Sequence, residues 1–353
     1  MKQEGFIGIS NDLSSKEYTK INSILKEYSI EPVKIEKIRS VYKVTTEGRI
    51  YCLKRMKHGG EEKVQKGMLL GQYLISKGFY HVVKYIKTND NKICIKRSHY
   101  IYYVTYWMKG RESNFDNFEE LKKCAAFLAD FHIKSKGFTI ESSKIINNYK
   151  KWPTIFKQER NDLNIIREVI ISKKVKTSFD INYLNAIDDY IDVIDMTIKL
   201  LDDSHYIDIS NNSSVQKTVC HDSFYYQNIL LKRNDRMYLI DLDSSLYDIH
   251  VYDLAKFIRR ILYQSNYAWD FNVAKDLIET YRAVNPISKD EYEILLAFIL
   301  FPHKFWKLGK KRYVKNKNWN ETKYLRKIDK LIKYEELEQK FLNDYLEYVN
   351  HLF

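Results

Sequence analysis

The stretch from His221 to Asp243, HDSFYYQNILLKRNDRMYLIDLD, decides the fold. A loop that begins at His221 ends in Asn228, and a short apolar strand from Met237 to Ile240 then ends in Asp241. The basic turn between two apolar runs predicts a strand, a turn and a second strand. Amide and carboxylate oxygens on adjacent backbone segments are ligands that Mg²⁺ prefers. We therefore expect Asn228 and Asp241 to hold one magnesium ion against the phosphates of a nucleotide.

This layout is that of a kinase catalytic loop followed by its metal-binding strand. Such a loop carries a catalytic Asp five residues before the metal-binding Asn, and that position holds Ser223. A hydroxyl cannot accept a proton near neutral pH as a carboxylate can, and losing a general base costs about 10²–10⁴-fold in rate. Asp222 lies one residue earlier and is expected to point away, because neighbouring side chains of an extended segment point to opposite sides. The candidate catalytic positions are Ser223, Asp222 and His221, while Asp243 is either a second metal ligand or a surface acid.

The bulk composition fits a globular protein of one two-lobed domain or two domains. The chain has 353 residues, of which 44% are hydrophobic and 30% charged, which is ordinary for a folded domain with a core. No apolar run is long enough to span a membrane, and the first residues lack the pattern of a signal peptide. The scattered cysteines, Cys52, Cys94, Cys124 and Cys220, predict free thiols in a reducing cytosol.

The net charge of +13 is concentrated near the C-terminus, where many lysines follow Lys304. Such a surface could attract nucleic acid, an anionic surface or a phosphorylated partner. The alternative is a solvated helical face in a lysine-rich protein. Because no aromatic–basic nucleic-acid motif is recognisable, a nucleic-acid partner is not expected, and the role of this region stays open.

The first part of the chain predicts a β-rich lobe. A helix is expected from Ser14 to about Tyr28, since Ser14 and Glu17 have the spacing of a capping box. A second helix is expected from Glu61 to Ser76. The predicted strands cover 33–38, 41–45, 50–56, 82–88 and 92–97, followed by an apolar run at 100–108.

After Met108 the period of the hydrophobic pattern becomes helical. Helices are predicted at 117–135, 153–172, 180–202, 251–264, 270–283 and 288–301, and from about 320 to the end. The polar segment from Ser204 to Ser214 is expected to be a loop. The predicted fold class is therefore α+β and two-lobed, with residues 1–108 as a small antiparallel β lobe and 109–353 as a larger helical lobe.

A lysine and an acid complete the candidate nucleotide site. Lys54 lies on a predicted strand, where a cation can bridge two phosphates. Glu61, with Glu62 as its competitor, begins the next helix and could hold that lysine in place. The turn before the second strand, Ile38-Arg39-Ser40-Val41, has no glycine that would let the backbone approach phosphates closely. Arg39 could reach them by its side chain instead.

Together these motifs resemble those of the aminoglycoside/choline phosphotransferase superfamily, whose members look like protein kinases and carry His-Gly-Asp-x-x-x-x-Asn followed by Ile-Asp-x-Asp/Glu. Within it, the chain is similar to the bacterial spore coat CotS-related proteins. The segments that carry the resemblance are 51–55, 109–112, 128–132, 135–138, 220–228, 240–243 and 253–254. The resemblance spans roughly residues 31 to 264.

The resemblance implies a role for each matching position. Lys54 would contact phosphates, Asn228 and Asp241 would bind metal, and His221 would brace the loop. Asp253 would be structural. The segment Tyr106, Trp107 and Met108 would surround an adenine, so that ATP and Mg²⁺ are the implied cofactors.

Two functions follow from the resemblance. The first is a spore coat-associated kinase-like protein of weak or absent catalysis, a possible pseudokinase, that acts in coat assembly and has other coat proteins as partners. The alternative is an active ATP- and Mg²⁺-dependent phosphotransferase on a small-molecule or protein hydroxyl. Ser223 and the glycine-free turn favour the first. The protein is expected to be made in the cytoplasm without a signal peptide and deposited on the spore coat.

Overall fold

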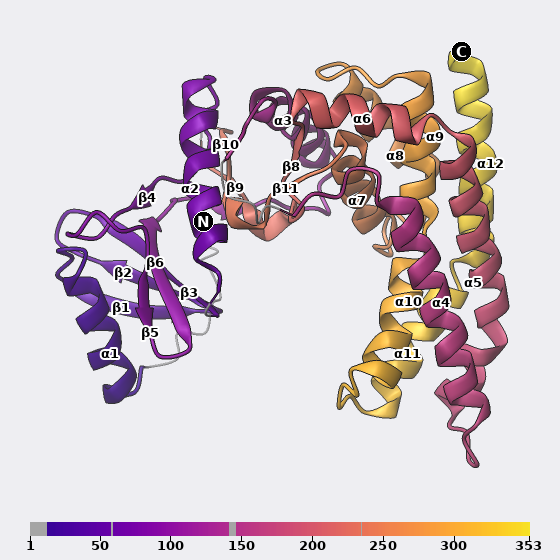
Figure 1. Cartoon of the computed structure of the whole chain (residues 1–353), viewed down its shortest axis with the longest axis horizontal. Coiled ribbons are helices and arrows are strands. Elements are labelled where there is room, and N and C mark those ends of the chain that lie inside the picture. Colours follow the sequence, from indigo (N-terminus) through magenta and orange to yellow (C-terminus); the bar gives the residue numbers. More distant parts are fainter. Residues whose placement is uncertain (1–12, 58, 141–145, 234) are drawn as a thin grey trace, which may run out of the picture. The chain divides into compact units, whose positions relative to one another are not determined.

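The computed structural model describes residues 13–57, 59–140, 146–233 and 235–353 (Figure 1). Its contacts divide the chain into two compact units. Unit 1 contains Met1–Glu120, Phe131–Ile146 and His221–Leu246, and unit 2 contains Leu121–Asp130, Asn147–Cys220 and Tyr247–Phe353. Residues 221–246 therefore belong to unit 1, whereas a single boundary after Met108 assigns them to the second lobe. All predicted site residues consequently lie in one unit.

An antiparallel six-stranded sheet forms the centre of unit 1. Its strands are β1 (Lys34–Ile38), β2 (Val41–Thr45), β3 (Ile50–Lys57), β4 (Tyr85–Ile86), β5 (Ile95–Arg97) and β6 (Tyr100–Tyr106). The order is β1-β2-β3-β6-β4, and β5 also pairs with β6. The register places Lys54 of β3 opposite Tyr103 of β6.

Helices α1 (Ser15–Lys26) and α2 (Glu61–Ser76) cover opposite faces of this sheet (Figure 1). Tyr102 and Val104 of β6 belong to the hydrophobic cluster of α1, whereas Ile101 and Tyr103 pack with Val64 of α2. This arrangement follows from the alternation of side chains along a strand. The predicted strands and helices of the first lobe are thus confirmed, with β4 and β5 shorter than expected.

The N-terminus of α1 is capped only in part as the sequence predicts. Ser14 Oγ accepts a hydrogen bond from Glu17 N at 3.2 Å. The Glu17 carboxylate does not complete a capping box, because it accepts hydrogen bonds from Tyr42 Oη at 2.6 Å and Lys37 Nζ at 3.0 Å. The acid therefore ties α1 to the sheet.

The predicted strand, turn and strand of the opening sequence are also present in unit 1. Strands β7 (Arg111–Glu112), β9 (Ile229–Leu231) and β10 (Met237–Leu239) form an antiparallel sheet in the order β10-β9-β7. A short 3₁₀ turn, η1 (Tyr226–Asn228), leads into β9, and a second, η2 (Leu242–Ser244), follows β10. Asn228 and Asp241 thus stand at adjacent ends of two paired strands.

Gly67 of α2 allows η2 to pack closely against that helix, whereas Gly71 lies at an ordinary contact distance from it. A Cβ atom on Gly67 would lie 2.4 Å from Tyr85 Oη and 3.0 Å from the backbone nitrogen of Asp243. One on Gly71 would meet the side chain of Leu242 at 3.5 Å. Gly67 therefore sets the distance between α2 and the segment that follows the predicted metal strand.

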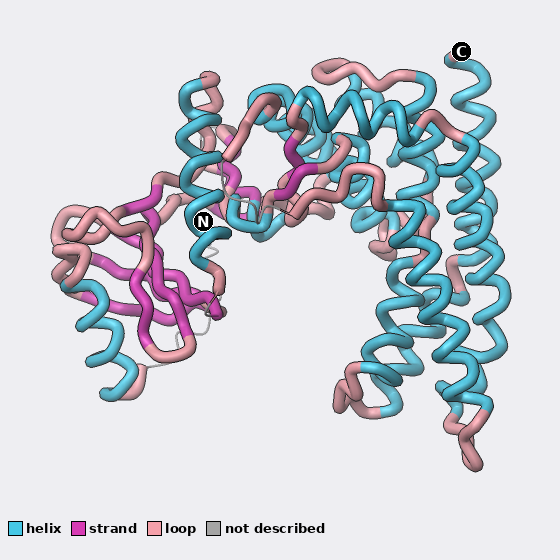
Figure 2. The backbone as a smooth tube through the Cα atoms, viewed as in Figure 1, coloured by secondary structure: helices cyan, strands magenta, loops and turns pink. Residues whose placement is uncertain are grey.

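Unit 2 consists almost entirely of helices (Figure 2). They are α4 (Trp152–Ile171), α5 (Ser178–Asp203), α6 (Tyr206–Gln216), α7 (His250–Leu262), α8 (Phe271–Arg282), α9 (Lys289–Leu300), α10 (His303–Gly309), α11 (Glu321–Ile332) and α12 (Glu335–Leu352). A π-helical turn, η3 (Lys310–Val314), follows α10. Helix α3 (Phe118–Ser135) and the short strands β8 (Val219–Cys220) and β11 (Leu246–Tyr247) complete the chain.

The predicted loop at Ser204–Ser214 is wrong, because α6 occupies it. Its serines and asparagines suggested a loop, but Tyr206 and Ser210 are buried. Ser210 Oγ accepts a hydrogen bond from Lys150 N at 2.7 Å. Tertiary contacts therefore override the low helix propensity of the segment.

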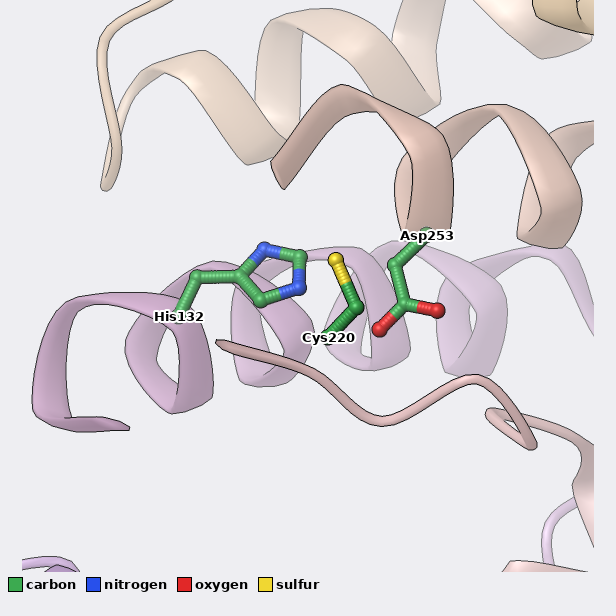
Figure 3. Close-up of side chains that lie close together, drawn as sticks. All are labelled: His132, Cys220 and Asp253. Atoms are coloured by element: carbon green, nitrogen blue, oxygen red, sulfur yellow. The ribbon is translucent and has the colours of Figure 1, made fainter. Parts of the chain in front are cut away.

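Side chains of two further motif positions are buried in unit 2. Figure 3 shows Cys220 at the end of β8 and Asp253 in the first turn of α7, and their ligand-type atoms lie within 4.8 Å of each other. Cys220 Sγ donates to Ile249 O at 3.3 Å.

All four cysteines are free, as the sequence predicts. His132, also drawn in Figure 3, is completely buried.

No helix among the described residues combines the length and the apolar character needed to cross a membrane.

We predict that Gly67→Ala destabilises the protein by about 2 kcal/mol, because overpacking forces backbone shifts. Gly48→Ala is the matched control, since no atom lies within 4 Å of the added methyl group. Urea unfolding of both variants measures the difference. Equal stabilities for the two variants would contradict the close packing of α2 against η2.

Candidate functional site

A cavity of about 740 Å³ lies within unit 1, a volume typical of small-molecule sites. Eight predicted site residues line it: Lys54, Tyr106, Trp107, Met108, Ser223, Asn228, Asp241 and Asp243. Glu61, His221 and Asp222 are not among its lining residues. The structure therefore brings most of the predicted site to one place, from segments far apart in the sequence.

The cation at the centre of the cavity is Lys54. Its Nζ lies 2.6 Å from Asp241 Oδ1 and 5.7 Å from the centroid of the Tyr103 ring. The side chain is only 14% exposed. Burial opposes the charge of Lys54, but Asp241 and then Asp243 outweigh it, so that its pKa is raised.

The expected ion pair between Lys54 and a first-turn acid of α2 is not formed. Glu61 Oε1 instead lies 2.8 Å from the Nζ of Lys96, on β5, while Lys54 pairs with Asp241. The reason is geometric: Lys54 extends toward the segment after β10, and Lys96 is the cation near the start of α2. The acid that holds the strand lysine is therefore Asp241.

The partly exposed carboxyl group of Asp241 and the buried one of Asp243 have pKa values shifted in opposite directions. Burial opposes the charge of Asp241, but the ion pair with Lys54 outweighs it and lowers the pKa. Burial raises the pKa of Asp243, and the neighbouring charge of Asp241 adds to the effect. Tyr103 Oη donates to Asp243 Oδ2 at 3.3 Å. The other oxygen, Oδ1, is buried and has no hydrogen-bond partner among the described residues.

The loop that begins at His221 is fixed by the imidazole of that residue. Its Nδ1 accepts a hydrogen bond from Ser223 N at 3.2 Å. The proton is therefore on Nε2, which donates to Ile240 O at 3.0 Å. His221 is completely buried. The histidine thus connects the loop to the end of the strand that carries Asp241.

The loop at Asp222 and Ser223 is not extended as expected, but Ser223 lines the cavity and Asp222 does not, as expected. Asp222 has φ +62°, so the loop is left-handed there rather than extended. Asp is one of the few residues other than glycine that adopts this conformation readily. Ser223 lines the cavity and Asp222 does not. Asn228 Nδ2 donates to Ser223 O at 2.9 Å and to Ser223 Oγ at 3.1 Å.

A lysine that the sequence did not point to lies next to this loop. Lys66 of α2 is buried and donates to the carbonyl oxygen of Ser245. Burial lowers its pKa to about 8, and the charges of Asp243 and Asp222 oppose that shift. The signal in the sequence is its spacing, since Lys66 precedes the buried Leu70 and Leu74 by one and two helical turns.

The turn between β1 and β2 closes one side of the cavity without glycine. Ile38 pairs with Val41, so only Arg39 and Ser40 form the turn, and Arg39 has φ +53°. Its guanidinium is held by Glu112 of β7, with Nη1–Oε1 and Nη2–Oε2 distances of 2.5 and 3.3 Å. The cation expected to reach toward phosphates is therefore paired with an acid at the rim.

The predicted adenine-binding segment continues β6 along the cavity. Tyr106 N donates to Lys84 O at 3.1 Å, and Trp107 N donates to Ile50 O at 2.9 Å. The Tyr106 ring stacks on Tyr51 with centroids 5.6 Å apart. Backbone hydrogen bonds thus fix this wall of the cavity.

The residues present fit a divalent cation. Asp241, Asp243 and Asn228 supply two carboxylates and an amide, the oxygen ligands that Mg²⁺ prefers. Asn228 Nδ2 is already used toward Ser223, which leaves the amide oxygen for a metal. The unpartnered Oδ1 of Asp243 is a second available ligand atom.

Comparison with solved structures defines the class of fold. An aminoglycoside phosphotransferase from Alicyclobacillus acidocaldarius matches with a TM-score of 0.81 and 21% identity, over 97% of this chain and 98% of that one. The AMP-bound spectinomycin phosphotransferase matches with a TM-score of 0.66 and 14% identity, over 93% and 98%. The protein therefore has the aminoglycoside phosphotransferase-like fold, with an antiparallel-sheet N-terminal lobe and a mostly helical C-terminal lobe.

Sequence comparison then gives the family. The family model described as "Spore coat putative kinase YutH" matches residues 21–345, and the chain belongs to this family. Spore coat protein S of Bacillus subtilis strain 168 is 26% identical over 263 residues, which is 73% of this chain and 73% of that protein. The predicted resemblance to spore coat proteins of the phosphotransferase superfamily is confirmed.

We predict that Lys54→Met lowers the free energy of unfolding by about 2 kcal/mol, because it leaves Asp241 and Asp243 without their cation. Lys96→Met is the matched control, since its ion pair with Glu61 is at the surface, where ion pairs contribute little to stability. Chemical unfolding in EDTA compares the two variants. A loss for Lys54→Met no larger than that for Lys96→Met would contradict the central role of the pair.

Proposed function

We propose that this protein is a spore coat-associated, kinase-like protein that binds Mg²⁺-nucleotide in the cavity of unit 1 and has weak or no phosphotransferase activity. The observation that carries the proposal is the position of Ser223. Its hydroxyl lies 3.1 Å from Asn228 Nδ2 in the cavity, where the family pattern has a carboxylate base. The protein keeps the groups that hold a nucleotide and lacks the one that activates an acceptor.

Nucleotide binding is supported by the cluster of Lys54, Asn228 and Asp241. A lysine whose pKa is raised stays positively charged and can contact phosphates, while the oxygen ligands would hold Mg²⁺. When bound, the metal neutralises charge on the phosphate oxygens. A solved relative of the same fold contains AMP, which supports a nucleotide ligand here.

Weak binding and weak catalysis are supported by three features of the site. Ser223 offers no base near neutral pH, and loss of a base costs about 10²–10⁴-fold. Asp222, the nearest carboxylate in the loop, does not line the cavity. The β1–β2 turn brings only Arg39 near the phosphates, and Glu112 already neutralises that cation.

A role on the spore coat is supported by the family and by the similarity to spore coat protein S. A protein of this fold with impaired catalysis would contribute to coat assembly by binding other coat proteins. Function in such a fold depends on the site rather than on the architecture. The protein would be deposited on the spore coat after synthesis in the cytoplasm.

The alternative function is an active phosphotransferase on a small-molecule or protein hydroxyl. The intact set of Lys54, Asn228 and Asp241 favours it, because phosphoryl transfer depends mostly on positioning and charge stabilisation. In that case ATP would be turned over, with Mg²⁺ stabilising the phosphate charge, without a carboxylate base.

We predict that Mg²⁺-ATP raises the melting temperature by about 2–4 °C at saturating nucleotide, since a ligand that binds only the folded state stabilises it. Asp241→Ala abolishes the shift, and EDTA removes it from the wild type. Asp90→Ala is the control, because Asp90 is an exposed acid of unit 1 away from the cavity lining.

Each variant is compared with its own nucleotide-free sample in differential scanning fluorimetry. The absence of any shift in the wild type at millimolar Mg²⁺-ATP would contradict nucleotide binding. A shift that Asp241→Ala retains would place the nucleotide elsewhere.

A further inference from the structure

Unit 2 carries a concentration of positive charge that the cavity of unit 1 does not use. Helix α10, the π-helical turn and α11 lie next to one another (Figure 1). Their lysines form what we call the basic strip: Lys304, Lys307, Lys311, Lys323, Lys327 and Lys330. All six belong to the described part of unit 2.

The strip is one electrostatic surface rather than separate charges. Burial and, after it, the charges of Lys330, Arg259 and Lys327 together lower the pKa of Lys304 to about 7. Burial also lowers the pKa of Lys311, and Lys327 is the next cause. Charges on α10, the π-helical turn and α11 therefore repel one another across the strip.

The strip has no paired counter-ions. Among the residues that the structure describes, none of its six lysines lies within ion-pair distance of a carboxylate. Two of the nearby acids are used elsewhere: Glu321 Oε2 lies 2.7 Å from Arg312 Nη2, and Asp329 Oδ1 accepts from Asn182 Nδ2 at 3.3 Å. A third, Glu159, lies 3.3 Å from His303 Nδ1, and its charge opposes the lowering of the pKa of Lys307 by burial without forming an ion pair with that lysine. Glu338 is buried, and burial raises its pKa to about 8. It is therefore a weak source of negative charge near neutral pH.

Helix α11 presents its lysines to solvent as a row. Lys323, Lys327 and Lys330 stand at i, i+4 and i+7, and all three are exposed. The face next to this row, with Tyr324, Ile328 and Leu331, is buried. Like charges at this spacing destabilise a helix. An anionic partner would remove that repulsion along the whole row.

The aromatic rings next to the strip lysines favour an acidic polypeptide over a single-stranded nucleic acid as the anionic partner. Lys323 and Lys311 lie 4.4 and 5.1 Å from the centroid of Trp319. Lys304 lies 3.5 Å from that of Tyr263. Single-stranded nucleic acids bind by stacking bases on free aromatic faces, but ammonium groups occupy these faces.

The type of cation in the strip also favours a polypeptide with carboxylates over a polymer with phosphates. Arginine provides the planar fork that matches phosphate, whereas lysine is a flexible point charge. Lysines outnumber arginines on α11, where Arg326 is the exposed arginine beside Lys323, Lys327 and Lys330. A flexible chain of carboxylates can satisfy such charges one at a time, without a fixed geometry.

We propose that the basic strip binds an acidic segment of a partner polypeptide, with Asp and Glu carboxylates on its ammonium groups. The proposal deepens the coat-assembly role proposed above, and rests on it, by naming the chemistry of the partner.

Fluorescence anisotropy with a labelled oligo-glutamate peptide tests the strip in the full-length protein. We expect binding that weakens with added salt, because screening reduces exposed charge interactions. Lys327→Glu should weaken it by about tenfold or more, since a like charge then faces the peptide. Lys289→Glu is the matched control: it makes the same charge change outside the strip, at the N-terminus of α9, where a helix favours acids.

Lys327→Glu preserves the fold, because a Glu four residues after Lys323 forms a favourable helical pair, and its melting temperature checks this. No binding at low salt, or equal loss in the two variants, would overturn the proposal. Tighter binding of an oligothymidylate of equal charge, or of phosphatidylglycerol vesicles, would also overturn it. The Mg²⁺-ATP shift in the same samples reports on unit 1 separately, so failure of the strip is distinguishable from failure of the nucleotide site.

Discussion

The candidate site in the cavity of unit 1 depends on the ion pair between Lys54 and Asp241. A lysine that is 14% exposed needs a nearby negative charge, because burying an unpaired cation is costly. Its partner comes from a segment almost two hundred residues later in the chain, so the pair joins strand β3 to the end of β10. It also decides the ionisation of the site, since Lys54 stabilises the charge of Asp241 while burial disfavours the charge of Asp243.

Two aspartates in and near this pair adopt a backbone conformation that few residues other than glycine adopt readily. Asp222 and Asp241 both have positive φ, at +62° and +72°, a conformation that Asp tolerates. Asp222 occupies the place of the glycine in the His-Gly-Asp pattern, so the loop keeps a glycine-like turn. The next residue is Ser223, which keeps its hydrogen bonds to Asn228. The loop is thus stabilised independently of the carboxylate that catalysis requires.

The sequence predicts what depends on local pattern and motif, and it fails where distant contacts decide. The positions of Lys54, Asn228 and Asp241 in the cavity can be predicted from strand ends and loop spacing. The alternation of side chains along β6 explains why one face of its sheet packs on α1 and the other on α2. The partner of Lys54 could not be found this way, because Glu61 and Asp241 are both acids at plausible places and only the fold shows that Lys96 takes Glu61. Helix α6 is not predicted, because its serines and asparagines favour a loop, whereas the buried contacts of Tyr206 and Ser210 stabilise a helix. Lys66 was missed because a lysine on a helix is ordinarily exposed.

The central claim is that this site keeps nucleotide-binding groups and lacks a catalytic base at Ser223. The most direct test is the rate of Mg²⁺-ATP hydrolysis by the wild type and by Ser223→Asp, with Asp241→Ala as the inactive control. We predict negligible turnover in the wild type and an increase of about 10²-fold or more in Ser223→Asp, the size expected for a restored general base. A wild-type rate equal to or above that of Ser223→Asp, and abolished by Asp241→Ala, would contradict the account and establish an active phosphotransferase.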